Sequence, residues 1–412
     1  MSLENCYKII HESAGIGSNK HNDKNNNQSD NISYLATFLK QSTFDKIKYR
    51  QTKLNHNLFD IIWPAIEKSH KSRKFDDYIN CDIVAPDFDV FVVFQEFLIP
   101  LIKDMHCLNI NQALKPRNRL FYFPIINGQR NEFINYEIDS FNKYVSEVSV
   151  ECSRNLDNFE LPINLNISQI EHVERVLLEK ILTTEFGKVI GEQEAGTYYT
   201  MSEILGKSSD IKNIINSSNL MMSIYNECFA LNDSIWPYGR GVFISHKGDL
   251  AAWINVQDHL RLTASTPKKQ LTNAGYAYSK VGRAVAYLEN KLQFRENYFL
   301  GYLSSRPSFL GTSLKISTVL TLPNLMKEIE NLRHLCIVRG LRMLPMNEKK
   351  FHCRVINMRS LGCTEWRLFQ DYCTAISNIV KLEDDMNFTN SKQIAATLVK
   401  IFRRKKNIIC NT

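Results

Sequence analysis

Apolar residues recur at three- and four-residue steps along several stretches of the chain, a spacing that predicts amphipathic helices. The first clear stretch follows Pro86-Asp87, a pair typical of a helix start. Its apolar positions are Phe91, Phe94, Leu98, Leu101 and Met105. This pattern predicts a small all-α domain over residues 34–114.

Two later stretches have the same spacing and also carry helix-start signals. The segment SQIE (168–171) has the form of a capping box, in which side chains at both ends satisfy backbone groups. The apolar stripe of the predicted helix comprises Ile170, Val173, Leu177 and Ile181. Thr364 is predicted to precede another helix. Its inward-facing positions are Trp366, Phe369, Cys373, Ile376 and Val380.

Shorter runs alternate between apolar and polar residues, which is typical of strands, as in YVSEVSVEC (144–152). Residues 242–245 and 250–254 are predicted to be strands joined by a hairpin loop at 247–249. Because strands and helices occur in separate runs, we predict an α+β domain over residues 144–390. Its antiparallel sheet should be flanked by helices.

The remaining segments are polar or irregular. Residues 1–33 are predicted to form a disordered leader, since SNKHNDKNNNQSDN (18–31) has almost no apolar residues to offset the entropy of ordering. Residues 115–143 are predicted to be a linker. Residues 391–412 are predicted to form a basic C-terminal helix, around 392–401, and a tail.

Composition excludes several classes of protein. No apolar run is long enough to cross a bilayer and the N-terminus has no signal-peptide pattern, so we expect a cytoplasmic protein without a membrane partner. The 10 cysteines show neither CxxC nor Cys/His spacing, which predicts reduced thiols and no protein-ligated metal. The formal net charge of +8 suits an anionic ligand, but the basic tail supplies much of it. No nucleic-acid-binding motif is present, so no nucleic-acid partner is expected.

The most informative segment is WPYGRGVFISHKGDLAAWINVQDHLRL (236–262). Its first turn contains two glycines that can take positive φ, and it directs Arg240 from a defined backbone position. A second arginine, Arg261, closes the segment. Guanidinium groups placed in this way could hold an anionic phosphoryl group.

Four motifs occur here in the order found in the guanidino, or phosphagen, kinases: WPYGRG (236–241), WINVQDHLR (253–261), YLSSRPSFLGTSLKIS (302–317) and VRGLR (338–342). The chain therefore resembles that family, and arginine kinases most. The resemblance extends over roughly residues 34–385. It implies the phosphagen-kinase fold, with a small α-helical domain and a larger α+β catalytic domain of glutamine-synthetase-like architecture.

The resemblance implies reversible transfer of the γ-phosphoryl group of Mg-ATP to a guanidino compound, with arginines neutralising the phosphates. On the matched motifs, Arg240, Arg261 and Arg339 are retained, together with Gly340 and Arg342. Lys315 stands where the family has arginine, which keeps the charge but loses the planar fork. An alternative for each basic residue is a solvated surface charge.

One departure lies in the phosphate-binding part of the motif set. The family pattern STRVR matches residues 147–151, so both arginines are replaced, and Glu147 and Glu151 introduce acids. A carboxylate at Glu151 is expected to repel a triphosphate, because like charges at ~4 Å cost on the order of 4 kcal/mol at an effective dielectric near 20.

Further departures lie on the guanidino side. Gln257 replaces the glutamate that, in the family, orients the guanidinium and takes its proton, and an amide cannot act as a general base. Arg306 replaces the reactive cysteine, and Leu344 replaces the glutamate of the mobile segment. The substrate-specificity loop is also altered; its matched residues are Ile79, Asn80 and Cys81.

Other reactive-looking residues have simpler interpretations. His259 is predicted to be a structural or phosphate-side residue rather than a catalytic one. Cys81, Cys152 and Cys353 are predicted to be small buried hydrophobic residues, since no basic neighbour can be assigned from the sequence.

Two hypotheses follow. The first is a degenerate family member with little or no phosphotransfer, which binds anions or nucleotides weakly through Arg240, Arg261, Lys315 and Arg339. It would regulate or bind an active kinase, as a homodimer or as a heterodimer with an active paralogue. The second is a divergent, active arginine kinase that binds ATP or ADP and a guanidino compound. Its missing carboxylates would be replaced by Asp258, Glu151 or Asp82.

Overall fold

The computed structural model describes residues 2–13, 35–70, 83–114, 133–206, 213, 220, 235–346 and 350–388. The Asn-rich segment 18–31, most of the predicted linker and the predicted C-terminal helix and tail lie outside these residues. Within the described residues, no helix is both long enough and apolar enough to cross a bilayer.

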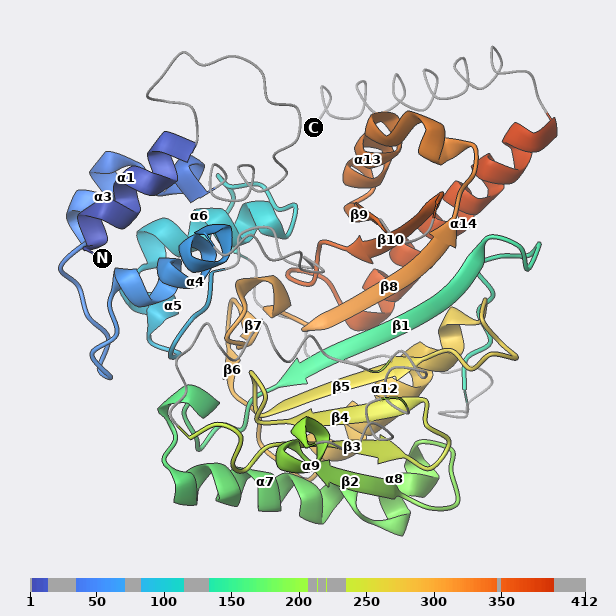
Figure 1. Ribbon diagram of the computed structural model, residues 1–412, viewed down its shortest axis with the longest axis horizontal. Helices are drawn as coiled ribbons and strands as arrows, with labels where there is room; N and C mark the ends of the chain where they lie inside the picture. Colours follow the sequence, from blue (N-terminus) through green and yellow to red (C-terminus); the bar gives the residue numbers. More distant parts are fainter. Residues whose placement is uncertain are drawn as a thin grey trace.

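The first part of the chain forms a helical domain, as predicted (Figure 1). Its helices are α1 (Leu3–Ser13), α3 (Gln41–Ile47), α4 (Leu58–His70), α5 (Val90–Val93) and α6 (Gln95–Met105). The prediction of a disordered leader from residue 1 needs correction, because α1 is ordered. Its Cys6 and Ile10 are fully buried in the core of this domain, and this packing offsets the entropy of ordering.

All five predicted apolar positions after Pro86-Asp87 are buried. The Asp87 carboxylate accepts a hydrogen bond from the backbone N–H of Val90 (3.1 Å), although the N-cap position of α5 itself is Asp89. The predicted single stretch is interrupted, however. Phe94 leaves helical geometry (φ −111°) and separates α5 from α6.

The larger domain contains one eight-stranded antiparallel sheet, in the order β2-β3-β4-β5-β1-β8-β10-β9 (Figure 1). The strands are β1 (Val145–Arg154), β2 (Gly196–Thr200), β3 (Gly241–Ser245), β4 (Leu250–Ile254), β5 (Leu260–Ser265), β8 (Leu314–Thr321), β9 (Leu341–Pro345) and β10 (His352–Asn357). A separate two-stranded hairpin joins β6 (Glu296–Asn297) to β7 (Gly301–Tyr302). The predicted α+β class with an antiparallel sheet is confirmed.

Helices cover one face of this sheet. They are α7 (Ile167–Ile181), α8 (Thr184–Val189), α12 (Ala274–Glu289), α13 (Ile329–Val338) and α14 (Glu365–Phe388). Short helical turns complete the domain: α9 (Met201–Leu205), η1 (Pro162–Asn164), η3 (Pro307–Phe309) and η4 (Leu325–Glu328). The β1 residues Val148, Val150 and Cys152 point into the core beneath the helices, so the alternate residues of β1 lie on the opposite face of the sheet.

The predicted apolar stripe of α7 is confirmed, since all four of its residues are fully buried. The predicted cap is displaced. The helix begins at Ile167, and the capping box is formed by Asn166 and Gln169, whose side chains each accept the other's backbone N–H (2.9 and 3.1 Å). The true box lies two residues earlier because Asn166 takes the extended geometry that a cap requires.

A seam of apolar and polar contacts joins the two domains. Five leucines of the larger domain belong to the core of the helical one: Leu161, Leu300, Leu303, Leu310 and Leu361. His106, at the end of α6, is fully buried between the carbonyl of Pro307 (3.0 Å) and the backbone N–H of Ser360 (3.1 Å). Burial lowers the pKa of His106 to about 3, so this ring is neutral in the physiological range.

His56 forms a second polar contact between the two domains, and this contact predicts a pH-dependent contribution to stability. Its Nε2 lies 2.9 Å from Asn164 Oδ1, and its Nδ1 lies 3.7 Å from the Asp60 carboxylate, which raises the pKa of His56. The pKa of His56 is raised in the folded state. The stability that protonated His56 adds is therefore fully present below its unfolded-state pKa, near 6.5, and is lost as the pH rises through its folded-state pKa.

We therefore expect His56→Gln to cost about 0.5–1 kcal/mol at pH 5.5 and less at pH 8.5, measured by urea unfolding at both pH values. In an Asp60→Asn background the pH dependence of this difference should shrink, because the carboxylate with the largest effect on the pKa of His56 is gone. An equal cost at the two pH values would contradict the assignment.

Candidate functional site

The face of the sheet opposite these helices is polar along the central strands, whereas over β3 and β4 it carries an apolar cluster with α9. On β1 the alternate residues Glu147, Ser149 and Glu151 lie on this face, opposite to the buried valines. Strand pairing places Glu151 beside Thr263 of β5 and beside Lys315 of β8. The predicted phosphate-binding positions of β5 and β8 are therefore neighbours of the central acid.

Arg261 and Glu151 form a buried ion pair on this face. One carboxylate oxygen of Glu151 accepts hydrogen bonds from Nη2 (2.7 Å) and Nε (3.2 Å) of Arg261. The side chains are only 11% and 18% exposed, and the guanidinium lies 4.7 Å above the ring of Phe309. Glu151, which was expected to repel a phosphate, is thus the ion-pair partner of Arg261, which was predicted to bind one.

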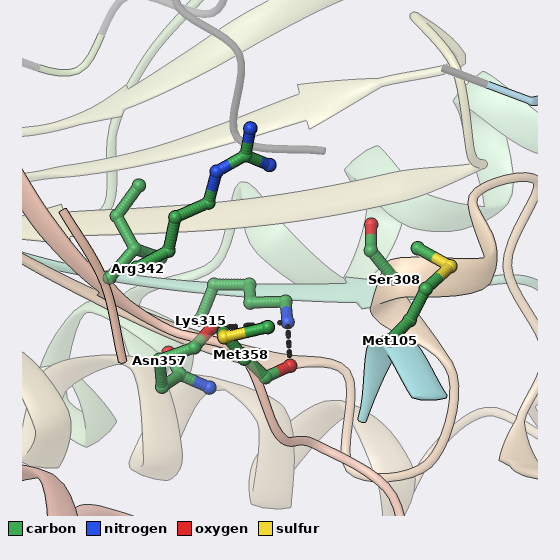
Figure 2. A pocket seen from close by; sticks show the side chains of 7 residues that line it. Met105, Ser308, Lys315, Arg342, Asn357 and Met358 are labelled. Carbon is green, nitrogen blue, oxygen red and sulfur yellow. Dashed lines mark hydrogen bonds between the residues drawn. The ribbon is translucent and has the colours of Figure 1, made fainter. Parts of the chain in front are cut away.

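Lys315 is buried on the other side of Glu151. Its amino group donates to the carbonyl oxygens of Met358 (2.9 Å) and Asn357 (3.4 Å), as Figure 2 shows. Burial lowers the pKa of Lys315 to about 8, since a charged amine loses hydration there. Lys315 also shares the Phe309 ring with Arg261, at 5.9 Å.

A small hollow opens beside Lys315 (Figure 2). Its lining residues are Met105, Ser308, Lys315, Arg342, Ile356, Asn357 and Met358. The amino group of Lys315 is turned toward the Met358 carbonyl, whereas the guanidinium of Arg342 extends in another direction. Ser308 is 6% exposed, and its buried hydroxyl has no hydrogen-bond partner.

The turn positions Arg240, but the guanidinium of this residue donates hydrogen bonds to backbone carbonyl groups. Its Nε donates to the carbonyl of Asn255 (2.9 Å) and its Nη1 to that of Tyr238 (2.9 Å), and the residue is 1% exposed. Gly239 takes the predicted positive φ (63°). Gly241 does not; it begins β3, where a Cβ would meet the Tyr199 carbonyl oxygen at 2.3 Å.

The VRGLR segment ends α13 and begins β9. Arg339 is the C-terminal cap residue of α13 and is exposed. Gly340 follows with φ of 69°, a left-handed geometry that favours glycine after a helix. Arg342 and Leu344 then lie on one face of β9, the face that carries Arg354 of β10. The structure groups Arg261, Lys315 and Arg342, while Arg240 stays in its turn and Arg339 faces outward.

The loop between β4 and β5 contains Gln257, Asp258 and His259, all of them buried. The Asp258 carboxylate accepts four hydrogen bonds, and the donors are Ser153 Oγ (2.5 Å), Asn155 Nδ2 (2.8 Å), Ser304 Oγ (2.6 Å) and the Ser305 N–H (2.9 Å). Its oxygens are therefore occupied by the protein. Gln257 lies next to this network with an amide in place of a carboxylate.

His259 has both ring nitrogens engaged by the backbone. Nδ1 accepts from the N–H of Leu156 (2.9 Å), so the proton is on Nε2, which donates to the carbonyl of Glu160 (2.8 Å). Burial lowers its pKa to about 4. This geometry agrees with a structural histidine. Cys152 and Cys353 are likewise buried, at 1% and 0% exposure, and burial raises the pKa of the Cys353 thiol.

Arg306 occupies a buried position, 6% exposed, immediately before the turn η3. Its carbonyl accepts from the N–H of Phe309 (2.9 Å), and its own N–H donates to Ser304 Oγ (3.2 Å). The loop that carries it is thus held by the Asp258 network. The predicted substrate-loop residues Ile79, Asn80 and Cys81 lie outside the described residues.

The sequence did not single out several residues that shape this site. They are Ser153, Asn155, Ser304 and Ser305 around Asp258, the unpartnered Ser308, and Arg354, which pairs with Glu147 at 3.4 Å. The hydroxyl-rich run YLSSRPS (302–308) was a usable signal, because a buried carboxylate needs such donors. The Arg354–Glu147 pair left no local signal, since its partners lie 207 residues apart.

Comparisons with known proteins agree with this architecture. Residues 177–386 match the family described as ATP:guanido phosphotransferase, C-terminal catalytic domain, and residues 29–103 match its N-terminal domain. Arginine kinase of Penaeus monodon is 26% identical over 363 residues, which cover 86% of this chain and 93% of the relative. Arginine kinase Pro c 2.0101 of Procambarus clarkii is 28% identical over the same coverage.

Solved structures give the same fold. The substrate-free duplicated taurocyamine kinase of Schistosoma mansoni superimposes with a TM-score of 0.72 at 20% identity, over 93% of this chain and 49% of that one. This chain therefore spans about half of that duplicated protein. Lombricine kinase matches with a TM-score of 0.63 at 17% identity, over 90% of this chain and 98% of that one. With both family domains matched in order, the chain belongs to the ATP:guanido phosphotransferase family.

Proposed function

We propose that this chain is a degenerate phosphagen kinase with little or no phosphotransfer activity, which serves as a binding or regulatory protein. The observation that carries the proposal is the state of Asp258. It is the one acid in the loop 255–259, and four hydrogen bonds hold its carboxylate inside the protein. A guanidino substrate therefore finds no carboxylate in this loop to orient it or to take its proton.

The cationic side of the site supports the same proposal. The family uses Mg-ATP, whose phosphates need cations that can receive them. Here Arg261 is engaged by Glu151, and Arg240 by two carbonyl groups. These residues do not fit a triphosphate well.

The remaining parts of the proposal concern partners and location. A cytoplasmic homodimer, or a heterodimer with an active paralogue, would give such a chain a regulatory role. Weak binding of ATP, ADP or a guanidino compound is compatible with the cations beside the hollow, Lys315 and Arg342. The same two cations favour the alternative function, a divergent active arginine kinase that transfers the ATP γ-phosphoryl group.

A coupled ATP/ADP assay with arginine, creatine, taurocyamine and lombricine separates the two functions. We expect turnover well below about 1 s⁻¹, the lower end of ordinary enzyme rates, with every guanidine. An active arginine kinase of known turnover, assayed in parallel, serves as the control. Turnover above that rate would establish the alternative.

Gln257→Glu tests whether one missing group explains the loss. We expect no restored turnover in the same assay, because Glu151, Arg306 and Leu344 alter the site independently of Gln257. A thermal-unfolding measurement on the variant ensures that the added buried carboxylate has not unfolded it. Recovery of turnover to about 1 s⁻¹ or more would show that a single substitution silenced an otherwise competent enzyme.

A further inference from the structure

The central strand β1 supplies carboxylates to cations on both sides of it. Glu151 pairs with Arg261 of β5, and Glu147 pairs with Arg354 of β10, on the same polar face. In each pair both side chains are less than one-fifth exposed, at 18% and 11% for the first and 12% and 18% for the second. The two pairs are alike in burial, but only the first involves a predicted phosphate-binding residue.

We propose that Glu151 is a specificity-determining residue: it acts as an internal counter-ion that excludes polyphosphate anions from Arg261. This inference rests on the proposed function, because it concerns the same polar face. The ligand it excludes is defined by its chemistry, a polyanion with phosphate-type oxygens. Glu151 does not exclude neutral or weakly charged ligands.

The geometry explains why an incoming anion would not simply displace Glu151. The carboxylate is part of the chain and is held on a strand paired on both sides, so it competes without any loss of translational freedom. It already takes Nε and Nη2 of Arg261, the edge of the guanidinium that would otherwise hold an oxyanion through two hydrogen bonds. The Phe309 ring lies against the guanidinium, at 4.7 Å from its centre.

The position of Lys315 strengthens the exclusion. Lys315 lies directly opposite Glu151 across β1 and β8, so an anion held by Lys315 would face this carboxylate at close range. Glu151 thus neutralises one cation by contact and weakens the field of a second. Removing its charge, while keeping its shape, should release both.

Binding of inorganic tripolyphosphate, measured by calorimetry without any guanidine, tests the proposal. We expect Glu151→Gln to lower Kd at least tenfold relative to wild type. The matched control is Glu147→Gln, which removes the same charge from the same face but frees Arg354 instead of Arg261. It should change Kd by less than about threefold, since Arg354 still donates to Ser317 Oγ (3.2 Å) and lies on β10, three strands away from Arg261 on β5. Equal gains in the two variants, or no gain in Glu151→Gln, would overturn the proposal.

The double variant Glu151→Gln with Arg261→Gln gives an independent arm. It replaces the ion pair with two neutral amides, so local net charge is unchanged and the two side chains can still form a hydrogen bond. We expect its Kd to be no higher than that of wild type, because Arg261 contributes nothing to anion binding while Glu151 holds it, and any gain would reflect the release of Lys315. Weaker binding than wild type would mean that Arg261 grips the anion in the native protein, and the proposal would fail.

The outcomes are distinguishable from those of the turnover assay. Phosphotransfer by the wild type would overturn the proposed function, whatever the tripolyphosphate affinities are. Unchanged affinity in Glu151→Gln would overturn this inference and would leave the turnover result as it stands.

Discussion

Replacing Lys280 with methionine is expected to lower the free energy of unfolding by about 3–5 kcal/mol. Lys280 lies on α12 and is fully buried, and its amino group contacts the carboxylates of Glu192 and Asp249. Those carboxylates are 0% and 8% exposed, so removing the ammonium leaves two negative charges without a cation in a poorly solvated region. Urea unfolding at pH 7 measures the loss.

Two comparisons make this prediction specific. Lys269→Met removes an exposed lysine and should change stability by less than about 0.5 kcal/mol. Adding Glu192→Gln and Asp249→Asn to Lys280→Met should recover much of the loss, because the uncompensated charges are then removed as well. A cost below about 1 kcal/mol for Lys280→Met would show that solvent or neighbouring donors, such as Tyr276, compensate the carboxylates.

Asp258→Ala is expected to be almost as damaging, at about 3–5 kcal/mol, because it leaves four buried donors unsatisfied at once. Those donors are Ser153 of β1, Asn155 just after it, and Ser304 and Ser305, so the loss should also loosen the loop that carries Arg306. Urea unfolding gives the size of the effect. Hydrogen exchange of the Ser305 amide would locate it.

Asp258→Asn keeps one acceptor oxygen and should cost less than the alanine variant. Asp157→Ala is the matched surface control, since its side chain is 45% exposed and pairs with Arg295 at 3.2 Å, and it should cost less than about 1 kcal/mol. If Asp258→Ala and Asp157→Ala lowered the free energy of unfolding by similar amounts, the structural role assigned to Asp258 would be contradicted. The argument that its carboxylate is unavailable to a substrate would then fail as well.

The sequence pattern correctly predicted elements that are stabilised mainly by residues close together in the chain. The stripe of α7 was readable because its residues recur at helical spacing and all meet one core. The cap of the same helix was misplaced by two residues, since Asn166 and Ser168 are both good caps and only the backbone geometry distinguishes them. The order of α1 was missed because its apolar residues pack on partners from other helices, which its own composition does not reveal.

For the site, the sequence identified the substitutions but not their consequences. Matching motifs showed Gln257, Arg306 and Glu151 in altered positions. The expected effect of Glu151 was repulsion of a phosphate. The structure instead places it in a hydrogen-bonded pair with Arg261, so the cation is neutralised before any ligand arrives. The sign of the local charge was predictable; the identity of the partner was not.

The sequence by itself determined the family, the α+β class and the residue types at each matched position, because these follow from spacing and order along the chain. Only the tertiary structure decided which charges are free to act. Glu151 and Arg261 are 110 residues apart, and Asp258 meets Ser153 across 105. Strand register brings such groups within hydrogen-bonding distance, and buried charges at that distance lose their availability to ligands.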